Sequence, residues 1–351
     1  MKVMAPRTRP LVGVVALTFL IAIAAMAAAS AVAAPSKKQE TIVIGYANPA
    51  ASEPGLRAIT YGMREAVKEL GLGWKVQEAN AGFSANKQVS DVDSFINVKV
   101  RGLTSWTLNS GAAEGVYKRA REAGIPVILY NSPSKFVTTK IQNATDSTCD
   151  VSRLQAEYIA KRIPKARVLA IKGPSFVPSI DFTNKCFFAA AKKAGLTIVD
   201  SRSNAGDGSD QTLESQSLMQ DMLAKSPKYD AAWAYADTSA YGMSAAITAT
   251  DRKIWSGYGP RNDAVILISR DGNKVAIDAI KNGQMTATFD PHYEQSGAAA
   301  IQVLKMFIKD RKPISSLPKS VVIPASIWDV KNLKSYTDQL RRKVVLPLKK
   351  S

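Results

Sequence analysis

The sequence predicts an α/β protein made of two doubly wound lobes, each with a parallel sheet covered by helices. Between residues 41 and 288, short runs rich in β-branched residues alternate with longer stretches of helical periodicity. Repetition of strand, helix and strand is typical of parallel sheets that are covered on both faces. The candidate strands fall into two successive runs, and a chain of 351 residues exceeds the size at which one core usually stops growing.

The predicted strands are short and apolar, and the predicted helices between them are longer and amphipathic. The strands are 41–46, 74–78, 103–108, 126–130, 167–171, 196–200, 230–236, 264–269 and 285–289. The helices are 55–70, 85–99, 112–123, 150–163, 182–194, 211–225, 239–250, 273–281 and 294–309. In the first helix the apolar residues share one stripe, and Gly71 ends it.

The first 34 residues have the pattern of an export signal. Lys2, Arg7 and Arg9 precede an apolar run over residues 11–23, and small residues at 31–33 suit a signal peptidase. We expect cleavage after Ala33 or Ala34 and release into the periplasm, with an uncleaved membrane anchor as the alternative. No cysteine follows the cleavage site closely, which argues against a lipoprotein.

The charge of the chain does not identify its partner. The formal net charge is +18, which in isolation suggests nucleic acid. The basic residues are dispersed, however, apart from pairs or triplets at 37–38, 341–343 and 349–350, and an exported protein does not meet nucleic acid. We therefore predict no nucleic-acid partner, and basic ends that anionic membrane surfaces attract.

Cysteine and histidine usage limits the chemistry. Cys149 and Cys186 form either a disulfide or two free thiols, and both alternatives are open at this point. With His292 as the single histidine, the sequence predicts no metal site. No phosphate-binding glycine motif follows the first strand, so we predict no nucleotide cofactor. The sequence has no Gly-x-Ser-x-Gly nucleophile elbow, so we predict no enzymatic activity.

Polar residues at predicted strand ends are candidates for ligand contact, because open α/β sheets bind ligands beyond the carboxyl ends of their strands. Asn109 and Asn131 end strands and offer amide donors and acceptors, although loop capping is the alternative. Asp237 and Asp271 could bind ligand or cap helices. Arg57 near a helix start is a further candidate, with a surface ion pair as the alternative. The aromatic Phe176, in a loop, is the candidate for stacking on the ligand.

Four segments together resemble the type I periplasmic solute-binding proteins of ABC importers, in the ribose and galactose branch. They are 42–71 (IVIGYANPAASEPGLRAITYGMREAVKELG), 101–132, 149–173 and 278–313. The resemblance implies two lobes, three hinge crossings and closure around one ligand. It places the first lobe at 41–144 plus 292–318 and the second at 145–291 plus 319–326. The basic C-terminal tail, 327–351, extends beyond the resemblance, and its apolar residues could pack as a short amphipathic segment.

The resemblance also implies a set of ligand-binding positions. The loop from Asn48 to Arg57, with Glu53 inside it, corresponds to the first binding loop, although Leu56 replaces an aromatic residue there. Asn131 and Ser132 stand where sugar binders carry Asp-Arg. The remaining positions carried over are Asn109, Asp181, Asp237, Asp271 and Asp290.

These observations predict a monomeric, non-enzymatic receptor that captures a small polar, sugar-like solute between its lobes and delivers it to an ABC permease. The replaced Asp-Arg pair leaves a nucleoside, an autoinducer or a lipid-like molecule open as the ligand. The alternative function is a periplasmic sensor that presents a non-sugar ligand to a transmembrane kinase or chemoreceptor, since the fold alone does not separate the two.

Overall fold

The computed structural model describes residues 41–143, 149–205, 211–225, 228–345 and 347–348. The predicted signal segment, residues 1–34, lies outside these ranges. Within them, no helix combines the length and the apolar character that a membrane span requires.

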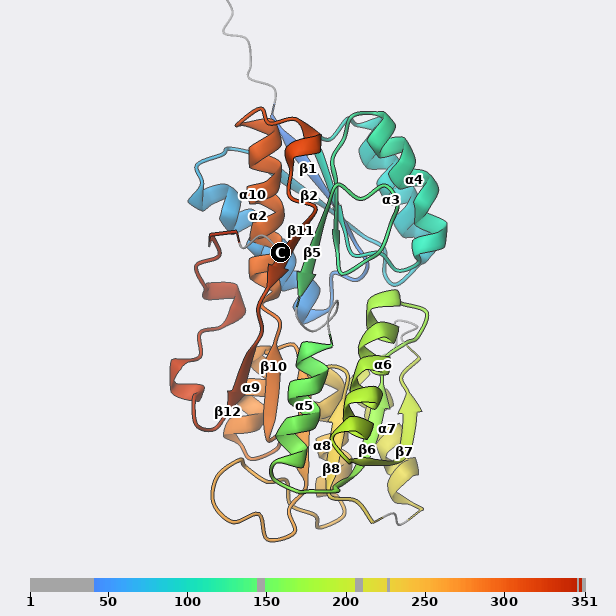
Figure 1. The fold of residues 1–351 in the computed structure, drawn as a ribbon, viewed down its shortest axis with the longest axis vertical. Helices are drawn as coiled ribbons and strands as arrows, with labels where there is room; N and C mark the ends of the chain where they lie inside the picture. The colour runs from blue at the N-terminus through green and yellow to red at the C-terminus, as the bar shows by residue number, and fades with distance from the viewer. Residues whose placement is uncertain (1–40, 144–148, 206–210, 226–227, 346, 349–351) are drawn as a thin grey trace, which may run out of the picture. The chain divides into compact units, whose positions relative to one another are not determined.

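The first lobe is built on a six-stranded sheet with the order β11-β5-β4-β3-β1-β2, and all its neighbouring strands are parallel (Figure 1). Its strands are β1 (Val43–Asn48), β2 (Lys75–Asn80), β3 (Gly102–Ser105), β4 (Val127–Tyr130), β5 (Thr139–Asn143) and β11 (Ser320–Ile323). Its helices are α2 (Pro54–Glu69), α3 (Ala85–Asn97), α4 (Ser110–Glu122) and α10 (Tyr293–Ile308), with the 3₁₀ turn η1 (Ile314–Ser316).

The second lobe repeats this plan with the order β12-β10-β9-β8-β6-β7, in which only β12 runs antiparallel to its neighbour. Its strands are β6 (Arg167–Lys172), β7 (Thr197–Ser203), β8 (Ala231–Ala234), β9 (Ile266–Arg270), β10 (Ala287–Asp290) and β12 (Ser326–Asp329). Its helices are α5 (Asp150–Ala160), α6 (Pro178–Lys193), α7 (Gln211–Leu223), α8 (Asp237–Thr248) and α9 (Lys274–Lys281).

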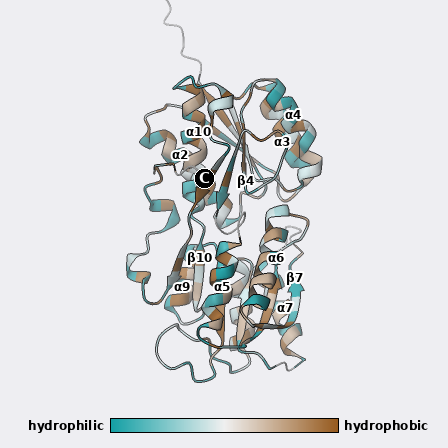
Figure 2. Ribbon diagram, in the orientation of Figure 1, coloured by the Kyte–Doolittle hydropathy of each residue, from teal (hydrophilic) through white to brown (hydrophobic). Residues whose placement is uncertain are grey.

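Helices cover both faces of each sheet, and alternate residues of a strand point to opposite faces, so each strand contributes to two cores. In β4, Ile128 and Tyr130 belong to the core beneath α2 and α10, whereas Val127 and Leu129 belong to the core beneath α3 and α4. In the second lobe, α5 and α6 cover one face and α7, α8 and α9 the other. Figure 2 shows the corresponding contrast between hydrophobic residues along the inner elements and hydrophilic residues on outer helix surfaces.

Each of the nine predicted strands and nine predicted helices is present within a few residues of its predicted position. The structure adds β5, β11 and β12, which the sequence did not predict. β5 and β11 pair with each other across a long sequence separation, from Lys140 with Ser320 to Asn143 with Ile323. This pairing gives both strands a stability that local sequence patterns do not reveal.

The position of β11 corrects one predicted lobe boundary. Residues 319–323 belong to the first sheet and residues 326–329 to the second, so the chain crosses at 324–325 and not at 318–319. The other crossings run from β5 to α5, across residues outside the described ranges, and from β10 to α10.

Parts of the predicted basic tail pack against both lobes. Trp328 lies in β12, and Val344 is buried in the first lobe's core with Ile301 and Val321. Two short 3₁₀ turns, η2 (Leu333–Ser335) and η3 (Gln339–Arg341), lie between these anchors.

Cys149 and Cys186 form a disulfide with a Cα–Cα distance of 5.2 Å, which decides between the two alternatives left open by the sequence.

Candidate functional site

A cavity of about 90 Å³ lies among loops that follow strands of both sheets. It is lined by Pro49, Glu53, Gly55, Leu56, Phe83, Trp106, Leu108, Pro174, Val177, Ile180, Gln211, Tyr235, Ala236, Arg270, Asp271 and Tyr293. Most of these side chains are apolar or aromatic, with Glu53, Gln211, Arg270 and Asp271 as the charged or amide groups. The cavity thus occupies the edge at which open α/β sheets bind ligands.

Trp106 forms the wall on the side of the first lobe. It follows β3, is only 6% exposed, and meets the ring of Tyr293 edge to face at a centroid distance of 5.5 Å. Its Nε1 donates a hydrogen bond of 2.8 Å to Ser179 Oγ at the start of α6. Trp106 therefore joins the two lobes through one hydrogen bond while its ring faces the cavity.

Arg270 and Asp271 form the charged part of the wall on the side of the second lobe. Arg270 is 4% exposed, and its guanidinium donates to the carbonyl of Tyr235 at 2.7 Å and to Thr183 Oγ1 at 3.1 Å. Asp271 accepts a hydrogen bond of 3.2 Å from the Tyr293 hydroxyl. These bonds fix both side chains before any ligand enters, which lowers the cost of ordering them on binding.

Asp271 lies next to a second buried carboxylate, Asp237. The backbone N–H of Asp237 donates to Asp271 Oδ2 at 3.3 Å, and the Asp237 carboxylate accepts from Ser269, Thr288 and the Asn273 N–H. Burial raises the pKa of Asp271 to about 6, against the opposing effect of the Arg270 cation. Burial and the charge of Asp271 raise the pKa of Asp237. Two carboxylates this close disfavour ionising together.

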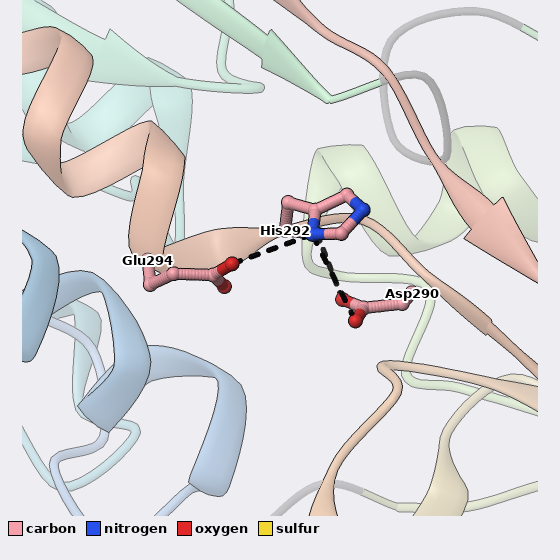
Figure 3. A group of neighbouring side chains, drawn as sticks. All are labelled: Asp290, His292 and Glu294. Atoms are coloured by element: carbon pink, nitrogen blue, oxygen red, sulfur yellow. Dashed lines mark hydrogen bonds and ion pairs between the residues drawn. The ribbon is translucent and has the colours of Figure 1, made fainter. Parts of the chain in front are cut away.

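A second polar cluster lies at the crossing from β10 to α10, where ligand atoms of Asp290, His292 and Glu294 all fall within 4.8 Å of one another (Figure 3). The Arg342 Nη1 lies 2.7 Å from Asp290 Oδ2, 2.9 Å from Glu294 Oε1 and 2.9 Å from His292 Nδ1. A protein cation thus contacts the three groups that would otherwise suit a divalent metal. Burial opposes protonation of His292, but the hydrogen bond to Glu294 and the charges of Asp290 and Glu294 raise its pKa overall.

Comparison with known proteins agrees with this architecture. A family model described as a periplasmic binding protein domain matches residues 8–312. The chain belongs to this family.

Two curated relatives illustrate the similarity of this periplasmic binding protein. It is 24% identical over 280 residues to the ribose import binding protein of Bacillus subtilis (strain 168), covering 79% of this chain and 85% of that protein. It is 21% identical over 300 residues to the ribose import binding protein of Escherichia coli (strain K12), covering 84% and 94%.

Solved structures with the same fold include two sugar or polyol binders. The Caulobacter myo-inositol binding protein superposes with a TM-score of 0.71 at 20% identity, covering 87% of this chain and 98% of that one. The arabinose ABC transporter component from Shewanella sp. ANA-3 gives 0.71 at 17% identity, covering 84% and 93%. At these identities the similarity establishes the fold of the periplasmic binding protein and no finer property.

Of the predicted ligand-binding residues, Glu53 and Asp271 line the cavity. Three others are buried within internal hydrogen-bond networks instead. Asn48 donates a hydrogen bond of 2.7 Å to Glu78. Asp237 accepts hydrogen bonds from Ser269, Thr288 and the Asn273 N–H. Asp290 contacts Arg342, Trp328 and Gln339. The polar side-chain atoms of these three residues form hydrogen bonds inside the protein, and none of the three is among the cavity-lining residues. Their contact with a solute stays a prediction.

The other predicted residues also lie away from the cavity lining. Asn109 is exposed and caps α4 by accepting from the Ala112 N–H, which was the stated alternative. Asn131 pairs with Asn143, donating to it at 2.8 Å. Arg57 lines a separate surface pocket, Phe176 is 53% exposed, and Asp181 forms an ion pair with Lys185.

The sequence reasoning missed several of the lining residues. Trp106 lies within the predicted strand 103–108, but β3 ends at Ser105, and the buried Trp106 side chain also lines the cavity. Arg270 was not singled out, although an arginine at the end of the apolar strand, directly before Asp271, is a usable signal. Tyr293 and Gln211 begin helices, and helix starts at this edge of the sheet face the cavity.

Proposed function

We propose that this periplasmic binding protein captures one small, polar, sugar-like solute between its lobes and delivers it to the permease of an ABC importer. The observation that carries the proposal is the cavity itself, which takes its walls from loops of both sheets. A solute seated there contacts Trp106 and Leu56 from one lobe and Arg270 and Asp271 from the other. Such a solute stabilises the closed arrangement, because it binds this arrangement better than an open one.

The lining suits a ring with hydroxyl groups at its edge. Trp106, Tyr235 and Tyr293 supply aromatic surface for the C–H face of such a ring. Arg270 supplies N–H donors, and Asp271 and Glu53 supply carboxylate acceptors, for hydroxyls at the edge. Ribose, myo-inositol and arabinose, which appear in the names of the similar proteins, are accordingly the first solutes to test.

The proposal extends to location and partners. The export pattern of residues 1–34 supports a periplasmic protein, and the names of the relatives support an inner-membrane permease as the partner. We propose that the protein acts as a monomer without a cofactor. We also propose that it acts without catalysis, and this is supported by a cavity lining that, among the described residues, contains no serine, cysteine or histidine. Loss of labelled-solute uptake in cells that lack this chain is the expected result for delivery.

The capture step is tested by thermal shift followed by calorimetry with ribose, myo-inositol, arabinose and galactofuranose. A solute present at about 100 times its Kd adds about 2.7 kcal/mol to the free energy of unfolding, which is visible as a higher Tm. We expect Trp106→Ala to raise the Kd at least tenfold. Phe176→Ala is the matched control, because that ring is 53% exposed and lies outside the cavity lining.

If none of the four solutes raises the Tm, the sugar-like class is refuted. If a solute binds and Trp106→Ala leaves its Kd unchanged, the solute binds elsewhere and the assignment of this cavity is refuted.

A further inference from the structure

The C-terminal segment from Ser326 to Val345, which we call the C-terminal strap, connects the two lobes a further time after the crossing at 324–325 (Figure 1, dark red). It begins in the second sheet, where β12 pairs with β10. It ends on the first lobe, where Glu69 on α2 accepts hydrogen bonds of 3.2 Å from the N–H groups of Val344 and Val345. The strap is therefore anchored at both ends, on different lobes.

The middle of the strap contacts the corner that carries the cavity residue Asp271. Gln339, only 4% exposed, donates through Nε2 to the Asp271 carbonyl at 2.6 Å and to Asp290 Oδ1 at 2.9 Å. The hydroxyl of Tyr336 donates to the Gly272 carbonyl at 3.1 Å. Both carbonyls of the corner are thus held by side chains of the strap.

This corner has an unusual backbone that requires outside support. Asp271 has a φ of 123°, a value that residues with a side chain rarely adopt, and Gly272 follows with a φ of 66°. A Cβ on Gly272 would lie 2.3 Å from the Cβ and Cγ of Asp290 at the hinge crossing. Strained backbone persists at a binding site only where surrounding contacts hold it. The strap supplies two such contacts, from Gln339 and Tyr336, and Gln339 also contacts Asp290 at the hinge crossing.

We propose that Gln339 and Tyr336 of the C-terminal strap are positioning residues for solute binding, which hold the Asp271–Gly272 corner in its binding geometry and link it to the hinge at Asp290. The effect on solute binding rests on the proposed function, whereas the effect on the conformation of the Asp271–Gly272 corner does not. Gln339 and Tyr336 are absent from the cavity lining, so they act on a solute through Asp271. Loss of the strap contacts frees the corner to leave the strained conformation that presents the Asp271 carboxylate.

The decisive experiment measures hydrogen exchange in the full chain with no added solute. In Gln339→Ala combined with Tyr336→Phe, we expect the amides of Gly272 and Asn273 to exchange at least tenfold faster. Amides in β1 should exchange at the rate of the unaltered protein. Leu340→Ala is the matched control, because Leu340 lies in the same 3₁₀ turn as Gln339, is 40% exposed and has an apolar side chain that cannot hydrogen-bond to the corner.

The outcomes separate positioning from general stability. Faster exchange confined to the corner supports the proposal. Unchanged exchange at Gly272 and Asn273 overturns it, and so does an equal acceleration in β1 and the corner, because that result shows a merely structural strap. If the double variant fails to fold, Tyr336→Phe alone, which removes one hydroxyl, is measured by the same criterion.

A second measurement uses ribose and myo-inositol as probes. If either binds, Gln339→Ala should raise its Kd at least fivefold, mainly by faster dissociation, whereas Leu340→Ala should leave it unchanged. An unchanged Kd in Gln339→Ala overturns the positioning role. If neither probe binds the unaltered protein, that result counts against the proposed sugar-like solute, and the exchange measurement still decides the role of the strap.

Discussion

Replacing Arg342 with methionine should be one of the most damaging single substitutions outside the cavity. The Arg342 side chain is 10% exposed, and it neutralises Asp290 and Glu294, whose side chains are fully buried. Methionine keeps most of the length and apolar volume of the side chain but removes the cation. Two carboxylates then stay buried at the crossing from β10 to α10 without their positive partner.

The expected magnitude follows from the remaining hydrogen bonds. Removing one partner of a buried ion pair typically costs about 3–5 kcal/mol. Asp290 keeps three hydrogen-bond donors, which are the backbone N–H of His292 at 2.9 Å, Trp328 Nε1 at 3.0 Å and Gln339 Nε2 at 2.9 Å. These bonds reduce the cost of leaving the Asp290 carboxylate buried without Arg342. Glu294 has fewer other contacts, chiefly His292 Nδ1 at 3.3 Å. We therefore expect a loss of about 3 kcal/mol, at the lower end of that range.

Urea unfolding at pH 7 measures this loss, with Glu294→Gln combined with Arg342→Met as the partner variant. Neutralising Glu294 removes the less well solvated of the two unpaired charges and leaves Asp290 with its other hydrogen-bond donors, so the double variant should recover more than half of the lost stability. Arg342→Lys should lose less than Arg342→Met, because it keeps the charge but lacks the planar fork. A loss below about 1 kcal/mol in Arg342→Met, or no recovery in the double variant, would refute the reasoning that buried charge dominates at this site.

The other predictions concern titration, the disulfide and close helix packing. Because the pKa of Asp271 is raised to about 6, the folded state binds the proton more tightly than the unfolded chain, and stability should fall as pH rises from about 4 to 6. Urea unfolding of Asp271→Asn at pH 4, 5 and 7 should show a smaller fall, and an identical pH dependence would contradict the shift. Replacing both cysteines with serine should lower stability by about 3–4 kcal/mol, given the separation of 37 residues between Cys149 and Cys186, and an unchanged denaturation midpoint would speak against that contribution. Gly297→Ala should destabilise strongly, because its Cβ would lie 2.1 Å from the Ile59 carbonyl where α10 packs on α2. Gly115→Ala, with only a side-chain atom at 3.8 Å, should be neutral or stabilising by up to about 1 kcal/mol, and equal Tm changes in the two glycine variants would be the contrary result.

The sequence was sufficient for the main elements because their stability comes from local patterns. Helix α2 shows one apolar stripe, and strands such as β4 are continuous apolar runs buried on both faces. β5 (Thr139–Asn143, TKIQN) mixes polar and apolar residues and is held between β4 and β11. β11 (Ser320–Ile323, SVVI) is an apolar run of only four residues, and its partner β5 is distant in the sequence. Non-local pairing is the physical reason that the sequence missed them.

The candidate site shows the same division. The rule that ligands bind at strand ends selected the edge of both sheets at which the cavity lies, and Glu53 and Asp271 line this cavity. Their contact with a solute stays a prediction. The same rule selected Asn109, whose amide caps a helix, and Asp237, whose carboxylate is surrounded by internal donors. A polar residue at a strand end suits a cap, a turn or a ligand equally well, so residue type alone does not choose among them.

By itself, the sequence determined the two-lobe α/β architecture, the family resemblance and the edge of the sheets where a ligand belongs. These depend on periodicity and on the order of elements along the chain. Only the tertiary structure decided which side chains reach the cavity, how the two cysteines pair and where the strap lies. It places Arg342 against Glu294, 48 residues away in the sequence, and Gln339 against Asp271, 68 residues away. Such contacts come from the docking of distant segments, which the pattern of neighbouring residues does not encode.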